Sequence, residues 1–305
     1  MVAIVVVTFN RLSLLKDLIV SLKEQQYSDN KIIVVNNGST DGTTEWLAEQ
    51  QGLVVINQDN VGGAGGFFTG MKYAAENEDF DYCWVMDDDV LCPPDALTEL
   101  INAAHADPSA GFVCSRVVSE DDEDLNVPIP AYLRRGHPYP LTFSRVASDA
   151  MVEVERATFV SVLIPVTNIR KFGLPLREFF IWGDDTEYNL RLSSSMPCYI
   201  ACRSKVTHRR QNKGGLDFLT EQNPRRLKMY YYYFYRNCFV YTRRWSTKRF
   251  AVAKLALEQL ILLAKLLLKF DFKRFRILAS ATWAGLWFNP KTLFPNVVAT
   301  PDKKG

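Results

Sequence analysis

Short β-branched runs alternate with helical patterns through the first third of the chain. Runs such as VAIVVVTF and KIIVVNN are typical of buried strands, and each is followed by a helix-like pattern. Repeated strand–helix alternation predicts a mostly parallel sheet between helices. In such sheets, ligands bind at the carboxyl ends of the strands. We therefore expect an α/β fold with its site along one edge of the sheet.

Polar motifs follow four of these strands, namely TFNR, NNGSTD, NQDNVGG and MDDD. Because the carboxyl ends of parallel strands meet at one edge, the motifs are expected to lie together. The position of all four motifs at strand ends is stronger evidence for a ligand site than any single motif. The expected strands span residues 2–9, 31–37, 53–58, 81–86, 152–165 and 198–208, and the expected helices span 12–25, 41–51 and 93–106. Residues 62–77 are expected to open as a loop and continue as a helix, and residues 179–192 to form a turn that leads into a helix.

The triplet Asp87, Asp88 and Asp89 ends the fourth strand. Three adjacent carboxylates repel one another, so an isolated triplet is usually no more than an acidic turn. A divalent cation among them removes the repulsion, and Mg²⁺ and Mn²⁺ prefer carboxylate oxygen. Since the triplet lies at the ligand edge and beside a glycine-rich turn, we interpret it as a metal site that faces a diphosphate.

The glycine-rich stretch NVGGAGGFFTG, residues 60–70, brings flexible backbone to the same edge. Glycine lets main chain approach a ligand, and a helix start offers free N–H groups to anions. Phe68 stands where a dinucleotide-binding fingerprint has its third glycine, and no GK[ST] follows. The stretch therefore weakens dehydrogenase and ATPase interpretations.

The motif WGDDTE, residues 182–187, sets more carboxylates at a helix start. Asp184 alone would be an ordinary N-cap, but Asp184, Asp185 and Glu187 exceed what a cap needs. One of them is expected to act as a general base toward a hydroxyl. His208 ends the last strand, where an imidazole would complete the metal shell, and Arg209 and Arg210 after it would meet phosphates.

Charge divides the chain of 305 residues into two parts. Residues 1–202 hold 14 Lys and Arg against 29 Asp and Glu, whereas residues 203–305 hold 22 against 5. The basic part is expected to seek an anionic partner. Its aromatic, helical stretches are interrupted by lysines, so they predict helices packed on the main domain, helices lying on an anionic membrane surface, or both. The same aromatic residues could form a contact within a homo-oligomer.

Three further features concern compartment and loops. Six cysteines show no CxxC pair, which indicates a reduced, intracellular chain. The N-terminal MVAIVVVTFN lacks a basic region and is interpreted as a strand, not a signal peptide. Residues 116–150 are acidic and then proline-rich, and they predict a long loop that is either a surface insertion or a flap over the site.

Together these motifs resemble family 2 glycosyltransferases with the GT-A fold. VVVTFNR, NNGST-D, NVGGAGGF, MDDD, GDDTEYNLR and the later histidine carry the resemblance over residues 1–210. The glycine-rich form is similar to bacterial galactofuranosyltransferases and some rhamnosyltransferases of surface polysaccharide synthesis. The resemblance implies a catalytic domain over residues 1–210 and a membrane-associating helical region over 211–305, at the cytoplasmic face of a bacterial membrane.

The resemblance also implies a role for each matching residue. Asp87, Asp89 and His208 would hold Mn²⁺ or Mg²⁺. Asp185 would be the base, with Asp184 supporting it or binding the acceptor, and the anomeric centre would invert. The nucleotide sugar would be bound by residues of the four strand-end motifs and the WGDD turn: Thr8, Asn10, Arg11, Asn37, Asp41, Asn60, Gly62, Gly63, Asp87, Asp88 and Trp182. The acceptor would be a lipid-linked glycan.

Four alternatives remain open at this point. UDP-galactofuranose is the first choice of donor, yet Asp41 and the loop glycines would accommodate dTDP-rhamnose equally. Galactofuranosyltransferases carry tryptophans in the acceptor-facing segment before the base. Here that segment is TFVSVLIP, and Phe159 is its only aromatic residue. A nucleotidyltransferase would show a basic glycine-rich loop after the first strand, which TFNRLS lacks. A non-catalytic membrane- or RNA-binding module would use MYYYYFYRNCFVYTRR to stack bases, but it would not explain the carboxylates, so no nucleic acid is expected.

Overall fold

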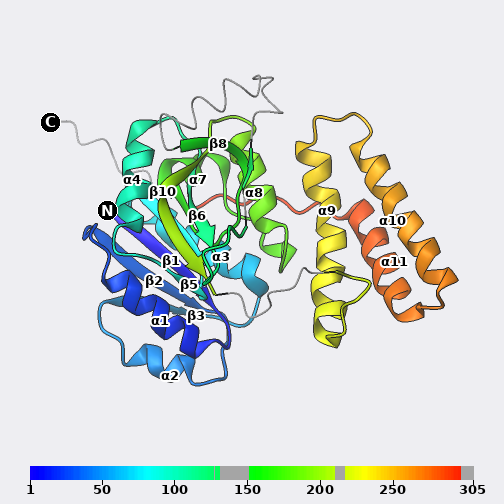
Figure 1. Ribbon diagram of the computed structural model, residues 1–305, viewed down its shortest axis with the longest axis horizontal. Helices are drawn as coiled ribbons and strands as arrows, with labels where there is room; N and C mark the ends of the chain where they lie inside the picture. The colour runs from blue at the N-terminus through cyan, green and yellow to red at the C-terminus, as the bar shows by residue number, and fades with distance from the viewer. Residues whose placement is uncertain (127, 131–150, 210–216, 297–305) are drawn as a thin grey trace.

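The computed structural model describes residues 1–126, 128–130, 151–209 and 217–296, and Figure 1 shows their arrangement. An α/β body holds the first part of the chain, and three long helices stand beside it. The strands are β1 (Val2–Thr8), β2 (Asn30–Asn36), β3 (Leu53–Asn57), β4 (Tyr82–Asp87), β5 (Val90–Leu91), β6 (Val113–Val118), β7 (Ile129–Pro130), β8 (Met151–Arg156), β9 (Val162–Pro165) and β10 (Tyr199–His208).

The helices of the body are α1 (Leu12–Lys23), α2 (Thr43–Ala48), α3 (Gly62–Glu76), α4 (Ala96–Ala106), α7 (Val166–Phe172), the short 3₁₀ turn η1 (Arg177–Phe179) and α8 (Asp184–Ser193). A π-helical turn, η2 (Arg226–Tyr231), leads into α9 (Tyr232–Trp245), which is followed by α10 (Ala251–Leu268) and α11 (Phe272–Trp287).

The sheet is mixed, with the order β3-β2-β1-β4-β9-β6-β10-β8-β7 and β5 paired to β10. β3, β2, β1 and β4 are parallel, as the alternation predicted. β9 then runs antiparallel to both β4 and β6. Residues 152–165, expected to form one strand, are two strands of different neighbours, β8 and β9. The expectation of a mostly parallel sheet is therefore correct for β3, β2, β1 and β4, whereas in the second half β6 and β10 are parallel and the other pairs are antiparallel.

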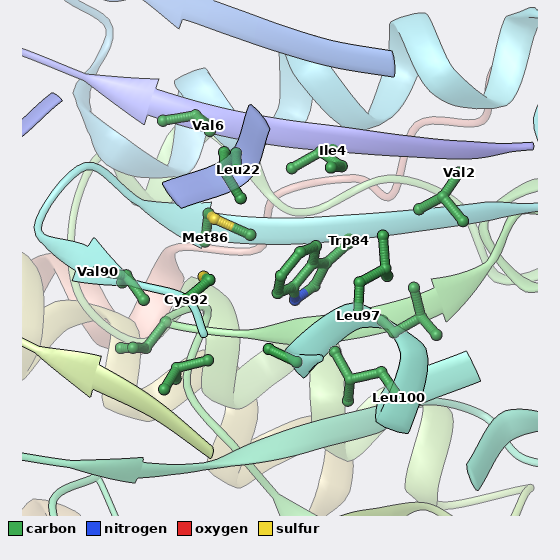
Figure 2. Packing of buried hydrophobic residues seen from close by; sticks show 14 of the residues in the cluster. Val2, Ile4, Val6, Leu22, Trp84, Met86, Val90, Cys92, Leu97 and Leu100 are labelled. Atoms are coloured by element: carbon green, nitrogen blue, oxygen red, sulfur yellow. The ribbon is translucent and has the colours of Figure 1, made fainter. Parts of the chain in front are cut away.

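Side chains of β1 alternate between the two faces of the sheet, because successive residues of a strand point to opposite sides. Val2, Ile4 and Val6 enter one core with helices α1 and α4, and Figure 2 shows them close to Trp84 and Leu22. Residues 3, 5 and 7 enter the other core, which α3, α7 and α8 cover. Each large side chain buried in this way contributes roughly 1.5–3 kcal/mol. Burial on both faces explains why β1 lacks polar residues before Thr8.

The glycine-rich stretch is helical from Gly62 onward, so the loop expected at its start is shorter than the sequence suggested. Gly66 and Gly70 lie one turn apart and face β1. A Cβ on Gly66 would come within 2.4 Å of Val7, and one on Gly70 within 2.2 Å of Val5. These glycines therefore let α3 approach the sheet closely and hold its N-terminus at the sheet edge.

The C-terminal helices pack on one another and on the body (Figure 1). Leu227, Tyr231, Leu266 and Leu278 form their shared apolar core, and Trp182 of the body packs against it. After α11, residues 288–296, here called the return segment, run back to the body. Leu174 N–H donates to Leu293 O at 2.8 Å, and Asn296 N–H donates to Glu76 at 2.7 Å. The helices thus leave the body and rejoin it.

Candidate active site

The three aspartates at the end of β4 divide between two environments. Asp88 is buried and accepts hydrogen bonds from Thr8 Oγ1 at 2.7 Å and Arg11 Nη1 at 3.0 Å. Arg11 also donates to Asp89 Oδ2 at 2.8 Å. Asp88 therefore joins β4 to the end of β1, and Thr8 and Arg11 are its partners. Asp87 and Asp89 share a different neighbour, His208.

One ligand atom from each of Asp87, Asp89 and His208 lies within 4.8 Å of the others. His208 Nδ1 lies 2.9 Å from Asn126 Oδ1, which only accepts, so Nδ1 carries the hydrogen and Nε2 keeps its lone pair. That Nε2 is 3.1 Å from the buried Asp89 Oδ1. Against the effect of burial, a protonated imidazole would pair with Asp89 and lower its pKa, whereas with the hydrogen on Nδ1 alone both atoms are acceptors. Two acceptors facing each other in this way fit a divalent cation between them.

Electrostatics at this site are those of crowded carboxylates. Burial raises the pKa of Asp87 well above its usual range, and the charges of Asp89 and Asp88 add to the rise. Asp184 acts on the pKa of Asp87 in the same direction, so the start of α8 adjoins the cluster. Burial also raises the pKa of Asp88 to about 6, against the lowering effect of Arg11. A cation would relieve this repulsion.

Asp184 and Asp185 form the first turn of α8, after Gly183 at φ +93°. Asp184 is buried, and burial followed by the charge of Asp185 raises its pKa to about 8. Burial raises the pKa of Asp185 as well, while the backbone N–H of Thr186 and the charge of Arg156 oppose the rise. Burial and mutual repulsion therefore favour a proton on this pair. Arg156, on β8, is a member of this site that sequence reasoning did not identify.

Two further charged residues of these motifs have partners within the protein. Glu187, grouped with the aspartates as a candidate base, is fully buried and pairs with Arg191 on its own helix. It also accepts from Trp245 Nε1 at 3.0 Å, so it holds α8 to α9. Arg209, expected to meet phosphates, pairs instead with Asp17 and Glu120. Arg210 and most of the predicted flap over residues 116–150 lie outside the described residues.

The loops after β1 and β2 are joined at the sheet edge. Asn10, at φ +54°, accepts from Thr40 N–H at 2.6 Å and donates its own N–H to Ser39 Oγ at 3.0 Å. Asp41 accepts from Leu12 N–H at 3.0 Å and from Thr43 Oγ1 at 2.6 Å. Burial alone would raise the pKa of Asp41, but these hydrogen bonds lower it. Asn10 and Asp41 therefore lie on one exposed edge.

A second group of expected site residues shapes the loop before α3. Asn37 is buried and donates to Gly62 O at 3.0 Å and accepts from Gln58 Nε2 at 2.9 Å. Asn60 Oδ1 accepts from Gly62 N–H at 2.9 Å. A Cβ on Gly62 would lie 2.0 Å from Phe180 O, whereas one on Gly63 would meet nothing within 4 Å. Asn37 and Gly62 are thus packed tightly within the loop, whereas Gly63 has free space where a side chain would begin.

Trp182 lies between the aspartate pair and the C-terminal helices. Its backbone has φ +59°, and its ring meets Tyr231 and Phe234 edge-on, with centroids 5.4 and 6.2 Å apart. The ring therefore packs against η2 and α9 while its main chain leads directly into α8.

The fold is similar to that of solved structures that contain UDP or GDP-Man together with Mn²⁺. One is GalNAc-T7 with UDP, GalNAc and Mn²⁺, with a TM-score of 0.62, 13% identity, and coverage of 81% of this chain and 48% of that one. Another is the mannosyltransferase PcManGT from Pyrobaculum calidifontis with GDP-Man and Mn²⁺, with a TM-score of 0.55, 16% identity, and coverage of 94% and 87%. The fold is GT-A.

The family model described as glycosyl transferase family 2 matches residues 3–159, about half of the chain. The chain belongs to glycosyl transferase family 2. It is 30% identical over 209 residues to galactofuranosyltransferase GlfT1 of Mycobacterium tuberculosis, covering 63% of this chain and 64% of that protein. It is 28% identical over 208 residues to GlfT1 of Mycolicibacterium smegmatis, covering 64% and 66%. The aligned part thus spans slightly less than two thirds of these relatives.

Proposed function

We propose that the protein is an inverting, metal-dependent glycosyltransferase that moves galactofuranose from UDP-galactofuranose to a hydroxyl of a lipid-linked glycan. The observation that carries the proposal is the meeting of two groups at the sheet edge. The triad of Asp87, Asp89 and His208 could hold a cation, and the pair Asp184 and Asp185 adjoins it. This is the set of groups that a displacement at an anomeric carbon needs.

Asp87, Asp89 and His208 would hold Mn²⁺ or Mg²⁺. When bound, the cation would supply positive charge against the donor diphosphate as the bond from the sugar to UDP breaks. Arg11 keeps Asp89 oriented through its 2.8 Å hydrogen bond, and Asn126 keeps His208 Nε2 directed inward. These two residues prepare the ligands before donor arrives.

Asp185 would take the proton of the acceptor hydroxyl. The acceptor oxygen then bonds to the anomeric carbon on the face opposite the leaving UDP, which inverts the centre. Asp184 is the more buried of the pair and burial raises its pKa, so Asp185 is the better placed of the two to act as the charged base. Arg156 favours that charged form.

Similarity to two mycobacterial galactofuranosyltransferases supports the donor. The loops around Asn10, Asp41 and Asn60 form the edge where a uridine would lie, beside the metal triad. The function would belong to the synthesis of surface polysaccharide, such as O-antigen or cell-wall glycan.

We place the protein at the cytoplasmic face of a bacterial membrane, through its C-terminal helices. Among the described residues, no helix is long and apolar enough to cross a bilayer. Exposed apolar side chains recur along α10 at helical spacing, and large aromatic ones stand out on α11 and in the turn before it: Leu257, Leu260, Ile261, Leu267, Leu268, Phe270, Phe272, Trp283 and Trp287. Exposed lysines flank them at 254, 265, 269 and 273. Such a surface fits anionic headgroups.

Saturation-transfer NMR in Mg²⁺ with a panel of nucleotide sugars tests the donor. We expect binding of UDP-galactofuranose in preference to UDP-galactopyranose and dTDP-rhamnose, and we expect EDTA to abolish it. Preference for dTDP-rhamnose would mean that the enzyme transfers rhamnose and not galactofuranose. If no nucleotide sugar binds with metal present, the proposed function is wrong.

A further inference from the structure

The segment that carries the aspartate pair has an unfavourable backbone. Phe180 and Trp182 have φ of +65° and +59°, and Gly183 follows at +93°. Left-handed backbone is unfavourable for a non-glycine residue, and bulky aromatic residues seldom adopt it. Such a segment keeps its shape only when neighbouring groups hold it. The holding groups come from α9 and α3.

Asn237 of α9 makes three hydrogen bonds to this segment. Its Nδ2 donates to Phe179 O at 3.0 Å, to Ile181 O at 3.3 Å and to Trp182 O at 2.9 Å. The side chain is fully buried. A buried amide with both hydrogens committed to main-chain carbonyls fixes those carbonyls strongly, because leaving them unpaired would be costly.

Arg236 extends this contact toward the start of the segment. Its Nη2 donates to Glu178 O at 2.6 Å and to Asn237 Oδ1 at 2.9 Å, so it also orients the amide. The guanidinium lies 3.8 Å from the ring centroid of Phe288 in the return segment. Arg236 is therefore held from the far side by the chain that rejoins the body.

The opposite side of the segment rests on α3. Ala64 N–H donates to Phe180 O at 3.1 Å, at the glycine-rich start of the helix. The segment that leads to Asp184 and Asp185 is thus held between α3 and the C-terminal helices. Neither side alone fixes all the carbonyls of residues 179–182.

We propose that Asn237 is a positioning residue for the transfer reaction: it holds residues 179–183 so that Asp184 and Asp185 face the metal triad. The inference rests on the proposed function, and it gives α9 a part in positioning the catalytic groups. Asn237 touches neither donor nor acceptor in this role. A displacement of about 1 Å at a reacting group can cost about 100-fold in rate.

The test compares Asn237→Asp with a matched control, Gln259→Glu. Aspartate keeps the shape of Asn237 but replaces the Nδ2 donor with an oxygen. That oxygen cannot donate to the three carbonyl oxygens it would face. Gln259 is also a buried amide, and it donates to Tyr235 O at 3.2 Å within the helices, away from the segment. We expect Asn237→Asp to lower kcat about 100-fold with KM for the donor changed less than about threefold. Gln259→Glu should leave both nearly unchanged.

Hydrogen exchange of residues 179–187 supplies a readout that does not depend on activity. Exchange there should rise in Asn237→Asp and stay at the wild-type level in Gln259→Glu, with β1 unaffected in both. If Asn237→Asp does not fold, Arg236→Met removes the adjoining guanidinium and should give a smaller fall in kcat and the same rise in exchange.

Equal kcat loss in Asn237→Asp and Gln259→Glu would overturn the proposal, since the effect would then be general destabilisation. Unchanged exchange at residues 179–187 would overturn it as well. If the wild type transfers no sugar, the proposed function fails, while the exchange data still decide whether Asn237 holds the segment.

Discussion

Glu187 accepts a hydrogen bond from the indole nitrogen of Trp245 at 3.0 Å, and Arg244 Nη1 lies 3.5 Å from the same oxygen. Glu187 lies two residues after Asp185 and is fully buried. The acidic run at the start of α8 therefore faces two ways: its first two carboxylates adjoin the metal triad, and its third binds α9. The C-terminal helices are connected to the site through α8 itself.

Replacing Asp89 with Asn should abolish metal-dependent donor binding. The change removes the negative charge and one of the two oxygens, so the side chain can no longer both ligate a cation and accept from Arg11. We expect kcat/KM to fall roughly 1000-fold, because a metal supplies several kcal/mol of charge stabilisation. Calorimetric titration with UDP in Mn²⁺ measures the binding. Asp95→Asn is the control, since Asp95 is exposed and makes no capping hydrogen bond. Wild-type binding in Asp89→Asn would remove Asp89 from the metal site.

Asp185→Asn should keep donor binding and lose turnover by about 100- to 10,000-fold, the usual contribution of a general base. The amide retains the size of the side chain but cannot accept the acceptor proton. Single-turnover assays alongside donor titration separate the two effects. Turnover equal to the wild type would show that another group is the base, and Asp184→Asn would then be the next variant.

Asp184 should make the metal-free protein less stable as pH rises. Its folded pKa is about 8, raised by burial and by Asp185, whereas an unfolded carboxyl titrates near about 4. The stability that its proton contributes is complete below about pH 4 and is lost as pH rises through about 8. Relative to Asp184→Asn, the wild type should lose up to about 1.4 kcal/mol per pH unit in this window. Urea unfolding in EDTA measures this difference, and a rise with pH would contradict it.

Gly62→Ala should destabilise the protein by roughly 2–4 kcal/mol, because the new Cβ would lie 2.0 Å from Phe180 O at a residue with φ +79°. The same clash displaces the segment before the aspartates, so turnover should fall as well. Gly63→Ala is the matched control, since a Cβ there meets nothing within 4 Å. Thermal unfolding of the two variants decides the point, and equal melting temperatures would mean the Gly62 contact yields easily.

Removing both exposed tryptophans of α11 should weaken binding to anionic vesicles by about tenfold or more. Trp283 and Trp287 are 66% and 72% exposed. The variant Trp283→Ser/Trp287→Ser is compared with Val20→Ser, which alters an exposed apolar residue of α1. Sedimentation with phosphatidylglycerol vesicles at low and high salt measures binding. Undiminished sedimentation of the double variant would place any membrane contact elsewhere.

Sequence reasoning predicted the parallel half of the sheet because each of those strands is a short apolar run that a helical pattern follows. It joined β8 and β9 into one strand, because residues 152–165 show a strand-like alternation and that periodicity does not reveal the break at 157–161. It also could not place β9 between β4 and β6, since strand order depends on pairings between distant segments.

Within the candidate site, the residues found from sequence were those in short motifs at strand ends. Asp87, Asp89 and His208 come together because β4 and β10 both end at the same edge, and a last strand ending in His was visible in the sequence. Asn126 and Asn237 left no such signal. Each acts through a residue more than fifty positions away, and an isolated asparagine in a loop or helix does not distinguish that role.

The return segment fastens the C-terminal helices to the body a second time, through Leu293 and Asn296. A unit attached at one hinge can swing, whereas a unit attached at both ends retains little rotation. The metal triad therefore keeps a fixed orientation relative to α10 and α11. If α10 and α11 rest on a membrane surface, their tilt sets the distance of the metal triad from that surface. An acceptor glycan whose terminal hydroxyl lies nearer to the membrane or farther from it would not reach the site.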